Sequence, residues 1–292
     1  MVKKNNLKIF AMSLIPLFLY SACSKSIAVK DDDSYRGNDY IESAYFVDQY
    51  VAEKNIDQVF DDFLLYILID AKIPERIAQN IMRLASEGPA FIMDILAVLQ
   101  GDPYLRVLVD KSHTLPADYE PDDLVVLSAG SYTVNRQGHL LRRQAAISLE
   151  EMARAARADG VTLMASSAYR SYSYQRDVYD RNVRQSGQEV ADRESARAGH
   201  SQHQLGLVVD FGSIDDSFAE TLAGKWLSAN ASSFGWSISY PKGYEDVTGY
   251  RWESWHYRYV GKELAYFIDT YFEGIQQYAL QFIYSWEKVG GL

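Results

Sequence analysis

The chain has 292 residues, of which 48% are hydrophobic and 23% charged, and its formal net charge is −10. This length suits one enzyme domain with an added part. The acidic balance argues against a nucleic-acid-binding protein, which carries clustered positive charge.

The first 22 residues are predicted to be an export signal. Three lysines precede an apolar run from Ile9 to Leu19, the order typical of secretory signals. The run is shorter than the roughly 20 residues of a membrane span. Residues 21–23 resemble a bacterial lipoprotein cleavage site, which predicts lipidation at Cys23. Tyr20 departs from the usual aliphatic residue there, so ordinary signal-peptidase cleavage remains the alternative.

Cys23 is the sole cysteine of the chain, so no internal disulfide is expected. Without residues 1–22 the chain carries 26 basic and 39 acidic residues, a net charge of −13. Residues 23–39 are expected to form a polar tether. We therefore expect an exported lipoprotein of the bacterial cell envelope, anchored in a membrane and facing the periplasm or cell wall.

Residues 40–103 are predicted to be a helical segment. Five apolar residues recur there at helical spacing: Phe60, Phe63, Leu64, Ile67 and Leu68. Pro74 suits the first turn of a second helix, and Gly88-Pro89 predicts a break before a third. These helices are expected to form a core; a partner-binding subdomain is the alternative, and no protein partner can be named.

Residues 104–265 are predicted to form one domain, in which helices and strands alternate. A capping-box pattern at Ser148 predicts a helix that ends near Gly160, and a second at Ser217 predicts a helix toward Asn230. Strands are expected over 161–166 and 236–240.

Ser171 or Ser173 is expected to cap a further helix that runs toward Gly187. The C-terminal extension, residues 266–292, is expected to be helical, with its aromatic residues buried in the core. The predicted class is α+β, with a small, mainly antiparallel sheet that carries a zinc site and is flanked by helices.

Two short blocks, 201–210 and 253–256, hold the residues suited to chemistry. His203, Asp210 and His256 make a set of two imidazoles and one carboxylate, which suits a zinc ion with an open position for water. Glu253 is placed to act as general base, or alternatively to orient His256. The other reading of the three ligands is a polar cluster that holds a loop. Ordinary structural roles are expected for the remaining histidines, His113, His139 and His200.

Spacing predicts part of the geometry. Residues 206–211 read as a short buried strand, whose alternation places Val209 and Phe211 on the face opposite Asp210. His203 must then lie in a turn that Gly206 permits and fold back toward the carboxylate. Between Glu253 and His256 the chain must turn or bulge.

The motif Ser-x-His-x-x-Gly-x-x-x-Asp, followed by Glu-x-Trp-His, resembles the zinc D-alanyl-D-alanine carboxypeptidases of the vancomycin-resistance type, whose metal fold is shared with the hedgehog signalling domain. The resemblance covers roughly residues 104–265 and includes the blocks 115–121, 167–171, 240–243 and 248–250. Several blocks in the expected order are more specific than one alone.

The resemblance implies that Glu253 is the general base and that Gln175 and Ser201 contact the peptide. It also implies that Arg170 acts on the substrate. A guanidinium there could hold a carboxylate or stabilise an oxyanion; an ordinary surface arginine is the alternative.

The expected function is zinc-dependent removal of the terminal D-alanine from peptidoglycan stem peptides. L,D-carboxypeptidase, D,D-dipeptidase and endopeptidase activities use the same chemistry and stay open, because specificity depends on cleft loops such as 241–250. A non-catalytic module that binds cell-wall peptide or a partner protein is the rival from another class. Manganese or iron is the alternative to zinc.

Overall fold

The structure is a computed structural model that describes residues 56–290. The expected export signal, Cys23, the tether and residues 40–55 lie outside the described residues. Contacts divide the chain into two compact units, one of residues 97–279 and one that joins the residues before 97 to those after 279. No helix between residues 56 and 290 is long and apolar enough to cross a membrane.

The smaller unit is helical. It contains α4 (Ile56–Asp70), α5 (Glu75–Glu87), the first part of α6 (Ala90–Gln100) and the last part of α13 (Gln276–Gly290). All five apolar residues that the spacing singled out in α4 are buried, as core-forming helices require. Two aromatic residues after 279 are also core: the Trp286 ring lies 5.0 Å from that of Phe63, and the Phe282 ring lies 6.1 Å from that of Phe91. Tyr284 is exposed, contrary to the expectation for this extension.

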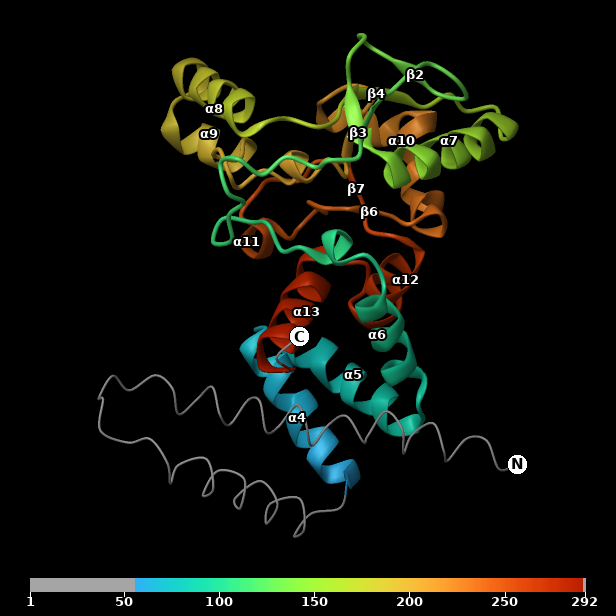
Figure 1. Cartoon of the computed structure of the whole chain (residues 1–292), viewed down its shortest axis with the longest axis vertical. Coiled ribbons are helices and arrows are strands. Elements are labelled where there is room, and N and C mark those ends of the chain that lie inside the picture. The colour runs from blue at the N-terminus through green and yellow to red at the C-terminus, as the bar shows by residue number, and fades with distance from the viewer. Residues whose placement is uncertain (1–55, 291–292) are drawn as a thin grey trace. The chain divides into compact units, whose positions relative to one another are not determined.

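The larger unit holds two small sheets and the remaining helices (Figure 1). Its strands are β1 (Leu124–Val126), β2 (Thr133–Val134), β3 (Leu140–Arg142), β4 (Met164–Ser167), β5 (Val208–Phe211), β6 (Trp236–Ile238) and β7 (His256–Tyr259). Its α-helices, besides the shared α6 and α13, are α7 (Arg143–Ala158), α8 (Tyr172–Ser186), α9 (Gln188–Glu194), α10 (Leu222–Asn230), α11 (Glu245–Thr248) and α12 (Lys262–Tyr271). Short 3₁₀ turns are η1 (Pro103–Arg106), η2 (Gln202–Leu205), η3 (Asp216–Glu220) and η4 (Ala231–Phe234).

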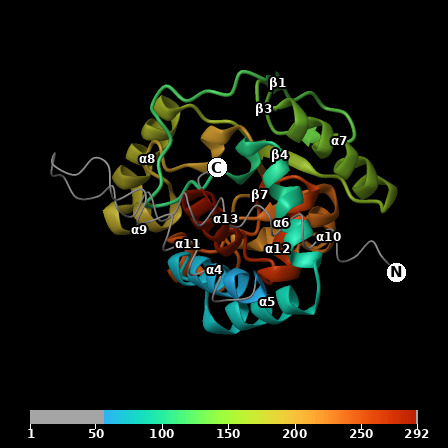
Figure 2. The same ribbon diagram turned by 60° about the horizontal axis from the view of Figure 1, so that its bottom comes forward.

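The main sheet has the strand order β2-β4-β5-β7-β6, and all its pairs except β2–β4 are antiparallel. The expected α+β class is therefore confirmed. In both views the pair α8 and α9 lies on the side of this unit opposite α7 (Figures 1 and 2).

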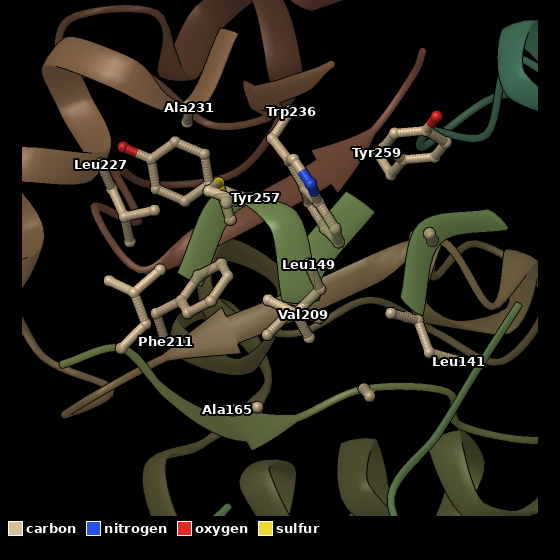
Figure 3. Packing of buried hydrophobic residues seen from close by; sticks show 14 of the residues in the cluster. Leu141, Leu149, Ala165, Val209, Phe211, Leu227, Ala231, Trp236, Tyr257 and Tyr259 are labelled. Atoms are coloured by element: carbon tan, nitrogen blue, oxygen red, sulfur yellow. The ribbon is translucent and has the colours of Figure 1, made fainter. Parts of the chain in front are cut away.

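One face of the main sheet packs against α7. Leu149 of α7, Val209 and Phe211 of β5 and Trp236 of β6 are almost fully buried and point toward one another (Figure 3). Alternation along β5 then turns Asp210 to the opposite face. The sheet thus separates an apolar core from the face that carries the polar residues of β5.

Both capping-box predictions were wrong in detail. Helix α7 begins at Arg143, so Ser148 lies inside it; its hydroxyl donates to the Phe234 carbonyl (2.6 Å) and accepts from the Trp236 indole (3.0 Å). Ser217 lies in η3, where its backbone N–H bonds to the Asp215 carboxylate. The next helix, α10, is capped instead by the hydroxyl of Thr221. A tertiary partner or a better cap took precedence over the local pattern in each case.

The other helix boundaries follow the sequence more closely. Ser171 caps α8, which is followed at its C-terminal end by Gly187 with a positive φ of 83°. Pro74 directly precedes α5. The predicted strands become β4 and β6, each within three residues of the expected bounds.

Candidate metal centre

The strand register brings two of the three predicted ligands together. Asp210 of β5 is the cross-strand partner of His256 of β7. Residues directly opposite in an antiparallel pair project to the same face. Both side chains are therefore held by backbone pairing, and Asp210 Oδ1 lies 3.1 Å from His256 Nδ1.

His203 arrives from a turn, as its spacing requires. It lies in η2, which Gly206 ends with a φ of 67°. A side chain at Gly206 would also meet Leu124, Arg142 and Pro121 at about 3 Å. The turn folds the His203 ring back over the sheet, so that Nε2 lies 3.2 Å from Asp210 Oδ2.

The tautomer of His203 follows from its second nitrogen. Nδ1 lies 2.7 Å from the carbonyl of Ala168, and a carbonyl accepts, so Nδ1 carries the proton. Nε2 then presents its lone pair toward Asp210. Burial, together with the nearby charge of Arg170, lowers the pKa of His203 to about 4. The ring is thus neutral and ready to act as a metal ligand.

His256 carries a proton in the metal-free protein. Burial lowers its pKa, but hydrogen bonds to Asp210 and Glu253 outweigh burial and raise the pKa to about 9. Burial raises the pKa of Asp210, but the surrounding side chains of His203, His256 and Arg170 keep that pKa well below its usual value. A metal ion that binds here must therefore displace the proton of His256.

The three side chains fit a metal ion. One ligand atom from each of His203, Asp210 and His256 lies within 4.8 Å of the others, and all three residues are buried. His256 Nε2 is buried and has no hydrogen-bond partner among the described residues, and a buried polar atom without a partner is costly. Two imidazoles and one carboxylate are a donor set that zinc prefers.

Glu253 stands beside these ligands on a turn. The N–H of His256 bonds to the Glu253 carbonyl across Ser254 and Trp255, which places the expected turn. The carboxylate of Glu253 is 3.3 Å from His256 Nδ1, and only 9% of the residue is exposed. Burial raises its pKa above the usual value, although His256 counteracts this. A buried carboxylate of raised pKa is suited to accept a proton from a nearby water.

Arg170 also reaches the ligands. Its guanidinium donates to Asp210 Oδ2 (2.8 Å) and to the Ser167 hydroxyl (2.9 Å), and 18% of its side chain is exposed. It is therefore no isolated surface arginine. The side-chain oxygen of Gln175 accepts from Arg170 at 3.4 Å, and the side-chain nitrogen of Gln175 donates to the backbone carbonyl of Ala196 at 2.7 Å.

Ser201 is buried, and its hydroxyl accepts from the His203 N–H at 3.3 Å. The remaining histidines lie outside the ligand set. Nδ1 of His113 is 2.8 Å from Asp110, Nε2 of His139 is 2.8 Å from Asn135, and Nδ1 of His200 is 2.8 Å from the Asp110 carbonyl.

Two further residues shape the centre, and sequence reasoning assigned them no role. The ring of Tyr240 packs 4.7 Å from that of His256, and the hydroxyl of Ser167 positions Arg170. Both belong to blocks that carry the family resemblance. Membership in those blocks was the available signal, but it did not show what the side chains contact.

Comparisons with known proteins find relatives of one enzyme family. The sequence profile of the VanY D-alanyl-D-alanine carboxypeptidase family matches residues 138–262. The protein YodJ of Bacillus subtilis (strain 168) is 37% identical over 199 residues, which cover 63% of this chain and 73% of YodJ. A D-alanyl-D-alanine carboxypeptidase of Enterococcus faecalis is 34% identical over 57% of this chain and 63% of the enzyme.

Two solved structures are similar over most of their own length. The LD-carboxypeptidase LdcB shares 37% identity, with a TM-score of 0.52 over 57% of this chain and 85% of LdcB. A VanY D,D-pentapeptidase mutant, solved with Zn(II), shares 31% identity, with a TM-score of 0.51 over 61% of this chain and 98% of that one.

Proposed function

Because this chain belongs to the VanY family of D-alanyl-D-alanine carboxypeptidases, we propose that it is a zinc-dependent enzyme that removes the terminal D-alanine from peptidoglycan stem peptides. Family membership gives a carboxypeptidase that acts on peptidoglycan peptides. The observation that carries the finer proposal is the buried cluster of His203, Asp210 and His256 with Glu253 beside it.

The three clustered side chains would hold the ion, and Glu253 would act from outside its ligand set. When bound, zinc supplies a Lewis acid and lowers the pKa of a coordinated water to about 7. The Glu253 carboxylate would take the proton of the attacking water and pass it to the leaving amine. Its burial excludes bulk water, which favours transfer of that proton to the substrate.

Arg170 would act on the peptide from its position beside Asp210. Its guanidinium is held by Ser167 and Asp210, and one nitrogen faces Gln175 at 3.4 Å. A partly exposed guanidinium that is fixed in this way suits a carboxylate or a developing oxyanion. The contacts of Gln175 and Ser201 favour positioning roles: Gln175 orients Arg170, and Ser201 caps the turn that carries His203.

A second specificity has its own support. LdcB, named an LD-carboxypeptidase, is more similar in sequence to this chain than the VanY D,D-pentapeptidase is, at 37% against 31% identity. Both activities release a terminal D-alanine, but the residue that precedes it has opposite chirality. L,D specificity is therefore the second candidate.

The test is to assay the zinc-loaded protein with two stem peptides, one ending in D-Ala-D-Ala and one ending in a single D-Ala after an L-centre. We expect release of D-alanine from one of them at a rate at least tenfold higher than from the other. A chelator should abolish this release, and added zinc should restore it. Absence of D-alanine from both digests would contradict the proposed function.

Metal binding should release a proton, because His256 is protonated in the metal-free protein below a pKa of about 9 and must bind as a neutral ring. His203, with a pKa of about 4, adds none above about pH 5. Zinc affinity should therefore rise about tenfold per pH unit between pH 5 and 8. Calorimetry at pH 6 in buffers of different ionisation enthalpy should count about one proton per zinc; a count near zero would contradict the charge state of His256.

We also propose that the protein is exported and anchored through Cys23, on the strength of the apolar run and the cleavage-site resemblance in its sequence. The wild-type protein should fractionate with membranes and label with a radioactive fatty acid. The Cys23→Ala variant should lose both properties. A variant that remains in the membrane fraction would refute anchoring at this residue.

A further inference from the structure

A polar pocket lies near the metal centre. Its volume is about 300 Å³, and it is lined by Lys111, Asp192, Arg197, His200 and Tyr250. These residues come from the segment before β1, from α9 and its following loop, and from the start of the loop after α11. All of them belong to the unit of residues 97–279.

The carboxylate in this pocket, that of Asp192, already has hydrogen-bond partners on both of its oxygens. Asp192 accepts from the Tyr179 hydroxyl (2.6 Å), from the Gln188 amide (2.9 Å) and twice from Arg197 (3.2 Å each). These bonds, led by that of Tyr179, lower the pKa of Asp192 to about 2. Asp192 and Arg197 therefore balance each other in charge.

Lys111 is the unbalanced charge. Its ammonium donates to the backbone carbonyl of Asp192 and lies 4.0 Å from the centre of the Tyr250 ring. It forms no ion pair with a carboxylate of the described residues. The pocket thus offers a positive group to a ligand that would bring a negative one.

Two further residues line the pocket beside Lys111. Tyr250 is 3% exposed, and its hydroxyl has no hydrogen-bond partner within the described part of the chain. His200 uses Nδ1 to bond the Asp110 carbonyl, so Nδ1 is the donor and Nε2 stays an acceptor in the neutral ring. The Tyr250 hydroxyl is too enclosed to meet a ligand, and an acceptor nitrogen would repel a carboxylate, so Lys111 is the group left to bind one.

The pocket is one aromatic ring away from the metal ligands. The Tyr250 ring lies 5.0 Å from that of Tyr240, which lies 4.7 Å from that of His256. His200 directly precedes Ser201 and is three residues from His203. An extended peptide advances about 3.3–3.6 Å per residue, so a substrate held at the metal centre can place a group a few residues from the scissile amide in this pocket.

We propose that this pocket binds a second carboxylate of the stem peptide, one other than its terminal carboxylate, with Lys111 as the residue that selects for it. The proposal rests on the proposed function. Stem peptides offer two such groups: the free α-carboxylate of a D-glutamate linked through its side chain, and the side-chain carboxylate of diaminopimelate. The chemistry of recognition is the same for both.

Two matched peptide pairs separate these sources. One pair differs only in diaminopimelate against lysine, which lacks the side-chain carboxylate; the other differs in D-glutamate against its α-amide. The wild-type enzyme should favour the acidic member of one pair about threefold to tenfold in kcat/KM. That pair then identifies the group.

The deciding variant is Lys111→Met, which keeps most of the aliphatic stem beside Tyr250 and removes the charge. It should reduce the ratio of kcat/KM for the acidic over the neutral peptide to about one. The neutral peptide should still be hydrolysed within about twofold of the wild-type rate. The matched control is Lys225→Met, because Lys225 is exposed and pairs with Glu220; it should keep the preference. Equal loss on both members of a pair, or a preference that survives Lys111→Met, would overturn the proposal.

A binding measurement separates failure of this pocket from failure of the proposed function. Calorimetry with the zinc-loaded Glu253→Gln variant gives the ratio of acidic to neutral affinity without turnover. A ratio that Lys111→Met abolishes supports the pocket even if hydrolysis is absent. A ratio of one in both pairs overturns the pocket and leaves any observed D-alanine release as support for the proposed function.

Discussion

Glu253→Gln should retain about one zinc per chain and hydrolyse D-alanine-terminated stem peptides at least ~100-fold more slowly than the wild type, the usual scale for loss of a general base. The amide keeps the size of the side chain but has no basic oxygen of comparable strength. Glu253 contacts His256 at 3.3 Å and is not part of the three-residue cluster that fits the ion. Elemental analysis gives the zinc content per chain, and steady-state kinetics give the rate of hydrolysis.

The matched control is Glu220→Gln, because Glu220 is exposed and pairs with Lys225. This substitution should leave the zinc content and the hydrolysis rate unchanged. Loss of zinc in Glu253→Gln would instead make Glu253 a ligand or the partner that orients His256. Full activity with zinc retained would exclude the general-base role. Absence of activity in the wild type as well would favour a module that keeps the zinc fold to bind peptide.

Much of the geometry of the metal centre was predictable, because it depends on the alternation of side chains along one strand and on the conformation of one glycine. Alternation on β5 places Asp210 opposite Val209 and Phe211, and the core packing confirms this. A seven-residue separation then forces His203 into a turn, which the left-handed Gly206 permits. These are local rules of backbone geometry, and they need no knowledge of the rest of the fold.

The helix starts were less predictable, because a capping box is only one of several ways to satisfy backbone donors. Ser148 matched the pattern, but it lies inside α7, where its hydroxyl joins Phe234 and Trp236. The bond from Ser148 to Phe234 joins residues 86 positions apart, so the sequence around Ser148 does not indicate it. Thr221 capped α10 although its neighbours do not form a capping box.

The contacts across strands and loops were likewise beyond the sequence. Nothing in the spacing of residues 170 and 210 indicates that Arg170 would donate to Asp210. The register that sets Asp210 opposite His256 depends on how β5 and β7 pair. The Lys111 pocket joins segments more than 80 residues apart, so its existence follows from the fold alone.

Asp210→Asn should abolish metal binding and, with it, hydrolysis. The Asp210 carboxylate is shared by Arg170 (2.8 Å), His256 (3.1 Å) and His203 (3.2 Å). An asparagine would turn its amide N–H groups toward Arg170 or His256, which are donors, and would offer no charged oxygen to the ion. We expect less than about one tenth of an equivalent of zinc after dialysis, and D-alanine release that falls in proportion to the zinc retained.

Thermal unfolding tests the same variant without relying on activity. A ligand that binds only the folded protein stabilises it, by about 2.7 kcal/mol when its concentration is 100 times Kd. Zinc should therefore raise the Tm of the wild type and of Asp123→Asn, a control whose carboxylate pairs with Arg142 at 2.7 Å. It should leave the Tm of Asp210→Asn unchanged. If Asp210→Asn keeps its zinc and its Tm shift, the aspartate only orients the two histidines, and the ion must be held by a different third ligand.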